Sequence, residues 1–221
     1  MDFDANNPRG KNAGRRLDEA GRRLDETQMP GDPIQLLSRW LEEAVASGNP
    51  EPTAMTLSTV GPDGMPSSRI VLLKQISQGA LVFFTNYNSR KSREIGQQAK
   101  VAAGFFWPGP ERQVRIEGTA KRIGEDESDR YFRSRPFESK VGAWASPQSE
   151  RIPDRGFLER TYERFWKKFE QAEEVPRPAH WGGFAIVPSR IEFWQGRSAR
   201  LHDRIEYLCD NDRWVMARLA P

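Results

Sequence analysis

The chain has 221 residues and a formal net charge of +3, from 34 Lys and Arg against 31 Asp and Glu, with a sequence pI of about 9.1. This length can bury one real core, and a mild, mixed charge favours a small anionic ligand over nucleic acid. The chain has one cysteine, Cys209, which excludes an intramolecular disulfide. Its only histidines, His180 and His202, are far apart in the sequence, so we expect no metal site. We find no apolar run of membrane-span length and expect a cytoplasmic, reducing location with no membrane partner.

The first 28 residues are polar and contain a near-perfect repeat, GRRLDEA at 14–20 followed by GRRLDE from 21. Two copies are too few for a solenoid. We predict a mobile N-terminal arm over residues 1–28 and a single domain over residues 29–221.

Helical patterns appear in four places. The first begins at Asp32 and Pro33, a cap followed by a residue suited to the first turn, and ends near Gly48. Its predicted apolar stripe is Ile34, Leu37, Trp40, Leu41, Ala44 and Val45. The other helices are expected after Ser89, over residues 125–135 and over residues 154–171, with a loop of small residues at 139–149.

Alternating or short apolar runs predict the strands. They span residues 54–60, 70–73, 81–84, 101–107, 111–118, 183–187, 190–194, 200–208 and 214–219. Residues 70–73 and 81–84 are expected to be neighbouring antiparallel strands. The pattern predicts a mainly β fold with helices (α+β), an antiparallel barrel or sandwich.

The helix that follows Asn88 and Ser89 begins with an unusual charge pattern. Arg90, Lys91 and Arg93 crowd an end where the backbone already carries partial positive charge, and carboxylates are the usual residues there. Free N–H groups beside Arg and Lys suit a bound phosphate. A solvated basic turn without a ligand is the alternative.

A second basic row lies in RLHDR, residues 200–204. If this segment is a strand, Arg200, His202 and Arg204 share one face. For this segment taken alone, an ordinary exposed barrel face is the favoured account. The common dinucleotide, phosphate-loop and nucleophile-elbow motifs are absent from the sequence.

Eight segments in order resemble the pyridoxine/pyridoxamine 5′-phosphate oxidase family from about residue 32 to the end. They are RIVLLK, FFTNYNSRKSRE, ERQVRIEG, YFRSRP, GAWASPQS, HWGGF, IEFWQGRSARLHDR and the terminal RLAP. The resemblance implies an antiparallel flavin-binding split β-barrel that works as a homodimer, with one FMN in each of two clefts between subunits.

The resemblance also implies site residues. Those matched to FMN contacts are Arg69, Ile70, Val71, Leu72, Leu73, Lys74, Phe84, Thr85, Arg90, Lys91, Gln113, Gln148, Ser149, Trp194 and Arg204. Those matched to substrate contacts are Lys74, Tyr131, Arg135 and Ser139 around the phosphate and Arg200, Leu201 and His202 at the ring, with Arg200 and His202 as the catalytic candidates. Two phosphates need two cationic pockets, and the chain supplies two sets.

The chain departs from the family pattern in two places. Phe84 stands where the family often has Tyr. The arm has Arg15-Arg16 and Arg22-Arg23 followed by Leu-Asp-Glu, without the Tyr that family members commonly carry, so no site residue is assigned there.

The implied reaction oxidises pyridoxamine or pyridoxine 5′-phosphate to pyridoxal 5′-phosphate, with dioxygen as electron acceptor and hydrogen peroxide as product. Positioning and electrostatics by the protein should dominate over a dedicated acid or base. Two alternatives remain: a related flavin oxidase of another ring substrate, such as those of phenazine pathways, and a non-enzymatic module that carries flavin or binds nucleic acid.

Overall fold

The computed structural model describes residues 23–221, which form two compact units. Unit 1 contains the described residues up to Leu57, Ala102–Gly118 and Pro188–Pro221. Unit 2 contains Ser58–Val101 and Thr119–Val187. The boundaries fall inside four strands, so these strands contribute residues to both units. The predicted single domain over residues 29–221 stays a prediction.

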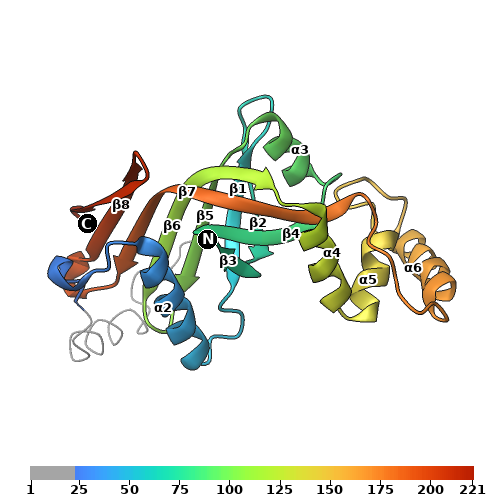
Figure 1. Cartoon of the computed structure of the whole chain (residues 1–221), viewed down its shortest axis with the longest axis horizontal. Helices are drawn as coiled ribbons and strands as arrows, with labels where there is room; N and C mark the ends of the chain where they lie inside the picture. The colour runs from blue at the N-terminus through green and yellow to red at the C-terminus, as the bar shows by residue number, and fades with distance from the viewer. Residues whose placement is uncertain (1–22) are drawn as a thin grey trace, which may run out of the picture. The chain divides into compact units, whose positions relative to one another are not determined.

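The described residues contain one hydrogen-bonded sheet of nine strands (Figure 1). Its order is β2-β1-β5-β6-β7-β4-β3, with β8 pairing β7 and β9. The pairs β3/β4, β4/β7, β7/β8 and β8/β9 are antiparallel, so the predicted mainly β, antiparallel architecture is confirmed. The strands are β1 Ala54–Val60, β2 Pro66–Leu72, β3 Gln75–Ser77, β4 Ala80–Asn86, β5 Lys100–Trp107, β6 Arg112–Arg122, β7 Trp181–Gln195, β8 Asp203–Asp210 and β9 Arg213–Arg218.

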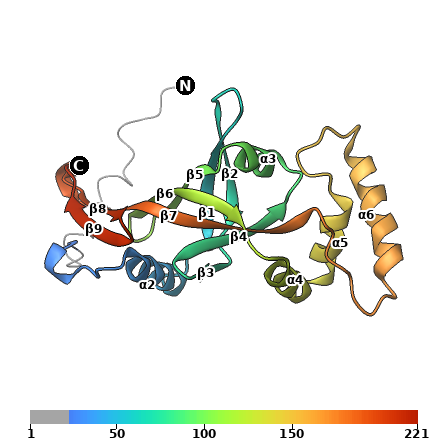
Figure 2. The ribbon, with the colours of Figure 1, turned by 45° about the horizontal axis from the view of Figure 1, so that its top comes forward.

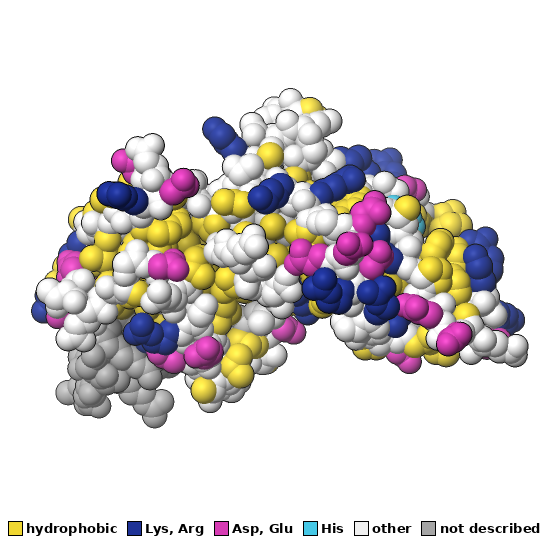
Figure 3. Space-filling view, viewed as in Figure 1, with side chains coloured by type: hydrophobic (Ala, Val, Ile, Leu, Met, Phe, Trp, Pro, Cys, Tyr) yellow, Lys and Arg dark blue, Asp and Glu magenta, His cyan; other side chains and the backbone are white. Residues whose placement is uncertain are grey.

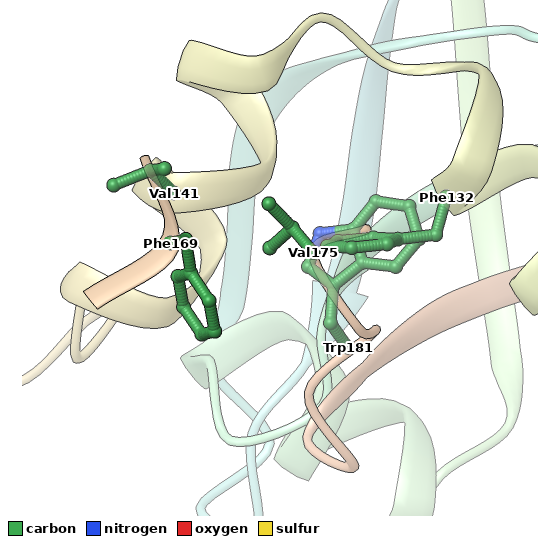
Figure 4. Packing of buried hydrophobic residues seen from close by; sticks show 5 residues of the cluster. All are labelled: Phe132, Val141, Phe169, Val175 and Trp181. Atoms are coloured by element: carbon green, nitrogen blue, oxygen red, sulfur yellow. The ribbon is translucent and has the colours of Figure 1, made fainter. Parts of the chain in front are cut away.

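Unit 2 carries four helices: α3 Arg90–Gln97, α4 Glu125–Ser134, α5 Phe137–Ala145 and α6 Arg155–Phe169. The last three lie close together (Figure 1), and residues of all three belong to a hydrophobic cluster or pack against it. Figure 4 shows its buried members, Phe132, Val141, Phe169, Val175 and Trp181. The predicted loop at 139–149 is therefore wrong over its first half, because α5 buries Val141 and Ala145 on one face and packs on α6.

Unit 1 carries α2 Pro33–Ala46, capped by Asp32, whose carboxylate accepts from the Ile34 N–H at 2.9 Å. Trp40 is buried and meets Phe193 of β7 edge to face. The predicted stripe is right at Leu37, Trp40 and Ala44, but Val45 is exposed and Leu36 is buried instead. The buried face of α2 is therefore displaced by about one residue from the predicted stripe.

Three strand predictions need correction. Residues 69–72 belong to β2, which pairs with β1, while β4 pairs with the short β3 through the turn at Gln78 and Gly79. Residues 183–194 form one continuous strand, β7, which runs through Pro188. Residues 200–202 precede β8: Ala199 and Arg200 have φ of 53° and 60°, so Arg200, His202 and Arg204 do not share a strand face.

Residues 1–22 of the predicted arm lie outside the described residues. The segment that follows packs on β8 and β9, which pair side by side (Figure 2). The N–H of Leu24 donates to Asp203 at 3.3 Å, and Arg218 pairs with Glu26 and with Asp203. A short 3-10 helix, η1 Glu26–Gln28, precedes α2. No helix among the described residues is long and apolar enough to cross a membrane.

Candidate active site

One cavity of about 480 Å³ lies within unit 2, a volume in the range that binds small ligands and cofactors. Residues from β2, β4, α3, α4 and α5 line it. Twelve of the predicted site residues are among them: Arg69, Ile70, Val71, Leu72, Lys74, Phe84, Thr85, Lys91, Tyr131, Arg135, Ser139 and Gln148. Most of the residues predicted to contact the FMN phosphate or the substrate phosphate therefore line one cavity.

Lys91 is the most buried cation of this cavity, with 9% of its surface exposed. Its ammonium donates to the hydroxyls of Thr85 and Ser89 at 3.1 and 3.3 Å and to the amide oxygen of Gln148 at 2.8 Å. No carboxylate of the described residues pairs with it. Burial, with a smaller effect of the positive charge of Arg69, lowers the pKa of Lys91 to about 8. An anion in the cavity would offset both effects.

The positive charge at the start of α3 is only partly neutralised. Ser89 is the N-cap residue of α3, but its side chain makes no capping bond and instead lies 3.1 Å from the Ser92 hydroxyl. Arg90 pairs with Glu94 at 2.7 Å, and its side chain is 58% exposed. Lys91, directed inward, is thus the basic residue of this turn that lines the cavity.

Arg135 follows the last residue of α4 and reaches the cavity along an aromatic wall. Its guanidinium lies 4.6 Å from the ring centre of Trp181, whose ring stacks on Phe84, which in turn stacks on Tyr131. Burial lowers the pKa of Arg135, and its buried Nη1 atom has no hydrogen-bond partner. A buried donor left unpaired costs about 1–3 kcal/mol, so an acceptor is expected there when the site is filled.

Further predicted site residues belong to unit 1: Trp194, His202 and Arg204 lie around the end of β7 and the start of β8, and Gln113 lies on β6. The ring of His202 lies 4.6 Å from that of Trp194, and its Nδ1 accepts the N–H of Arg197 at 3.1 Å. Arg204 binds the buried Glu192 through two nitrogens, at 2.9 and 3.0 Å. Gln113 is half-buried on β6.

The remaining predicted residues do not line the unit 2 cavity. Leu73 is buried, and Arg90 is engaged by Glu94. Ser149 is exposed, with φ of 72°. Arg200 and Leu201 belong to unit 1, and Leu201 is 70% exposed.

Five residues that line the cavity were not predicted: Asn86, Gly142, Ala143, Ser146 and Trp181. All five fall inside or beside the segments that carry the family resemblance. Small residues on α5 give no chemical signal of their own, whereas Trp181 could have been found as an aromatic residue next to two glycines. A Cβ on Gly183 would lie 2.4 Å from Ile123 and 2.9 Å from Phe84, so the backbone approaches this wall closely. Among the described residues there is no group of three or more His, Cys, Asp or Glu side chains that could hold a metal.

Comparison with known proteins assigns the family. The family model described as pyridoxamine 5′-phosphate oxidase matches residues 41–169, and that of the pyridoxine 5′-phosphate oxidase C-terminal dimerisation region matches residues 181–221. Pyridoxine/pyridoxamine 5′-phosphate oxidase from Trichormus variabilis is 49% identical over 210 residues, 95% of this chain and 98% of its own. That from Chromobacterium violaceum is 52% identical over 86% of this chain and 89% of its own.

Two solved structures share the fold. PhzG from Burkholderia lata 383, in complex with tetrahydrophenazine-1-carboxylic acid, is 31% identical, with a TM-score of 0.85 over 90% of this chain and 98% of its own. A pyridoxamine 5′-phosphate oxidase-related, FMN binding protein from Nostoc punctiforme is 16% identical, with a TM-score of 0.68 over 90% and 100%. The predicted fold class is confirmed by both, and the chain belongs to the pyridoxamine 5′-phosphate oxidase family.

Proposed function

We propose that this protein is an FMN-dependent oxidase that converts pyridoxamine and pyridoxine 5′-phosphate to pyridoxal 5′-phosphate, with dioxygen as electron acceptor. Relatives that bear this name are about half identical over most of the chain. The observation in the structure that carries the proposal is a pair of cations in one cavity, the buried Lys91 and the half-buried Arg135, neither of which pairs with a carboxylate of the described residues. Two such cations suit two phosphates, one on the cofactor and one on the substrate.

The residues fit FMN. Lys91, with Arg69 beside it, offers charge-assisted contacts to a terminal phosphate at the start of α3, where backbone N–H groups also point. The side chains and main chain of β2 and β4 then lie along the cavity for the ring system. When bound, FMN supplies the acceptor for the hydride that leaves the 4′ carbon of the substrate, and dioxygen then takes up the electrons as hydrogen peroxide.

The substrate is held at its 5′-phosphate by Arg135, Lys74, Tyr131 and Ser139. Arg135 is assigned the leading role because its planar guanidinium is fixed over Trp181 and keeps Nη1 available to an acceptor. A substrate without the phosphate would leave this buried donor unpaired, which weakens binding by the cost of desolvation.

Arg200 and His202 are proposed to act on the pyridine ring. Because Nδ1 of His202 accepts the N–H of Arg197, the neutral imidazole carries its proton on Nε2, the atom it can offer to a substrate. Contact with Trp194 fixes the plane of that imidazole. Arg200 is exposed, with φ of 60°, and contributes a permanent positive charge.

We also propose a homodimer in which unit 2 of one protomer and unit 1 of its partner form each site. The segment that matches the dimerisation model, residues 181–221, contains Trp194, Arg200, His202 and Arg204, all predicted site residues. An isologous dimer of this kind has two equivalent sites. The predicted cytoplasmic location is kept as part of the proposal; the free, exposed Cys209 suits a reducing compartment.

One experiment tests the function. The purified protein should show an FMN absorption spectrum and release peroxide when pyridoxamine 5′-phosphate is added in air. The alternative is an oxidase of another ring compound, which the likeness to PhzG brings forward. That alternative gains support if peroxide forms with a ring carboxylic acid at a rate above that with pyridoxamine 5′-phosphate.

The other alternative is a module that binds nucleic acid. Acidic and basic side chains are intermixed on the face shown in Figure 3, which does not suggest a nucleic-acid surface.

A further inference from the structure

A cluster of polar side chains lies behind Arg69, outside the residues that line the cavity. Its members are Thr59 of β1, Ser67 of β2 and Glu94 of α3, and we call it the Glu94 cluster. Glu94 is buried, with 4% of its surface exposed, although it carries a carboxylate. Burial raises its pKa, but hydrogen bonds from Thr59, Ser67 and Arg90 outweigh that effect and lower the pKa to about 2. The carboxylate is therefore ionised at neutral pH.

The guanidinium of Arg69 contacts all three members of this cluster. Nη1 of Arg69 lies 2.6 Å from the hydroxyl of Thr59, and Nη2 lies 2.5 Å from that of Ser67 and 3.4 Å from Oε2 of Glu94. The same two hydroxyls lie 2.5 and 2.7 Å from Oε2 of Glu94. Each hydroxyl thus stands between the carboxylate and the guanidinium.

The direction of these hydrogen bonds follows from the chemistry of the groups. A hydroxyl has one proton and two lone pairs, an ionised carboxylate only accepts, and a guanidinium only donates. Thr59 and Ser67 must therefore donate to Glu94 and accept from Arg69. A glutamine in place of Glu94 could donate to the hydroxyls, which would turn their protons toward Arg69 and oppose the contact.

We propose that Glu94 is a positioning residue for the cofactor: by setting the direction of the Thr59 and Ser67 hydroxyls, it holds the guanidinium of Arg69 in the orientation that binds the FMN phosphate. This inference rests on the proposed function. Arg69 lines the cavity together with Lys91, and its charge acts on the Lys91 ammonium, so both cations face the same region. Glu94 is not among the residues that line the cavity.

The test compares the affinities of the ligand-free protein for FMN and for riboflavin, which differ only in the phosphate. The ratio of the two dissociation constants isolates the phosphate contact and is not moved by a general loss of packing. In E94Q we expect the preference for FMN to fall about tenfold, the worth of one weakened charge-assisted contact. S67A should act in the same direction, and it carries the test if E94Q does not fold.

The chain offers a matched control. Ser68 is the next residue of β2, and its hydroxyl pairs with that of Ser58 at 2.8 Å on the exposed side, away from Glu94. S68A should therefore leave the ratio unchanged. Because Glu94 and Ser67 act through one guanidinium, the double variant E94Q/S67A should lose no more preference than the more affected single variant.

Two outcomes would overturn the inference in different ways. If the wild-type protein prefers FMN but E94Q keeps or increases that preference, Glu94 does not position Arg69, and an increase would mean that its negative charge merely repels the phosphate. If the wild-type protein binds riboflavin and FMN equally, the proposed cofactor contact fails, and the role of Glu94 fails with it.

Discussion

The ammonium of Lys91 donates to the side-chain amide oxygen of Gln148 at 2.8 Å, which joins the first turn of α3 to the segment after α5. An amide oxygen and two hydroxyls are the partners of this lysine, and all three are uncharged. They orient the ammonium without neutralising it. A buried cation held in this way is prepared for an anionic ligand, since neutral acceptors compete weakly with a phosphate.

Replacement of Lys91 by methionine should remove the positive charge that is held ready for the FMN phosphate. The methionine keeps most of the apolar stem, so packing is largely retained. We expect FMN affinity to fall about ten- to a hundredfold, the worth of a contact of about 1.5–3 kcal/mol, with riboflavin affinity nearly unchanged. Fluorescence titration of the ligand-free protein measures both. Arg93→Met, an exposed change on the same helix, is the control; an equal loss in both variants would contradict a specific role for Lys91.

The pH dependence of FMN binding should follow the same residue. The pKa of Lys91 is about 8 in the ligand-free protein, and FMN binds the charged form. Above pH 8, binding must therefore take up a proton, and affinity should fall by up to about tenfold per pH unit.

The folding stability of the ligand-free protein should instead rise with pH above pH 8. Between pH 8 and the ordinary lysine value of 10.5, the unfolded state holds a proton that the folded state lacks, so stability rises with pH. Lys91→Met should lack both effects, and their persistence in that variant would assign them to another group.

The sequence predicted the chemistry of this region better than its local structure. The crowded charges of Arg90, Lys91 and Arg93 indicated an anion, but they could not show which cation points inward. That depends on Glu94, one turn later on α3, which engages Arg90 and leaves Lys91 directed at the cavity. Which of these cations points inward depends on the packing of the folded chain and cannot be predicted from the spacing of residues in the sequence.

Two errors in secondary structure have local causes. Helix α5 was predicted as a loop because its small residues, Gly142 and Ala143 among them, carry weak helical signals; packing on α6 stabilises it. The RLHDR segment alternates like a strand, yet Ala199 and Arg200 adopt the left-handed conformation that sequence patterns rarely predict for such residues.

Arg135→Ala should raise KM for pyridoxamine 5′-phosphate and leave the FMN content normal. The preference for the phosphorylated over the unphosphorylated amine should shrink about ten- to a hundredfold, because one charge-assisted contact is lost. Steady-state kinetics with both substrates measure this ratio. Arg133→Ala, an exposed change two residues earlier, is the control. Loss of FMN from the Arg135 variant would contradict the proposal that Lys91 binds the cofactor phosphate and Arg135 the substrate phosphate.

Gly183→Ala should destabilise unit 2 by about 1–3 kcal/mol, the usual cost of overpacking. Its Cβ would lie 2.4 Å from Ile123 and 2.9 Å from Phe84, which is the cross-strand partner of Gly183. Thermal unfolding should show the loss, and a second change, Ile123→Ala, should restore part of it. Gly96→Ala is the contrasting variant: nothing lies within 4 Å of that position in α3, so it should be neutral or slightly stabilising. Equal effects at both glycines would show that close approach at Gly183 is not the cause.

A mixture of two impaired variants should recover activity, measured at a substrate concentration far below the raised KM, if each site is shared between protomers. Arg135→Ala damages the part of the site in unit 2, and Arg200→Ala damages the part in unit 1. In a heterodimer of the two, unit 2 of the Arg200 variant meets unit 1 of the Arg135 variant, and one of the two sites is wild type in every residue. Random assortment makes half of the dimers mixed, so activity should return to about a quarter of the wild-type value.

Co-expression with two different affinity tags, followed by sequential purification, isolates the mixed dimers. Their activity should then be about half that of the wild-type dimer, because one of their two sites is intact. The control is a mixture of Arg135→Ala with Lys74→Ala, both in unit 2, which leaves every site damaged and should recover nothing. If the mixed dimer of the first pair is as inactive as this control, each site is completed within one chain, and the proposed sharing of sites between protomers is wrong.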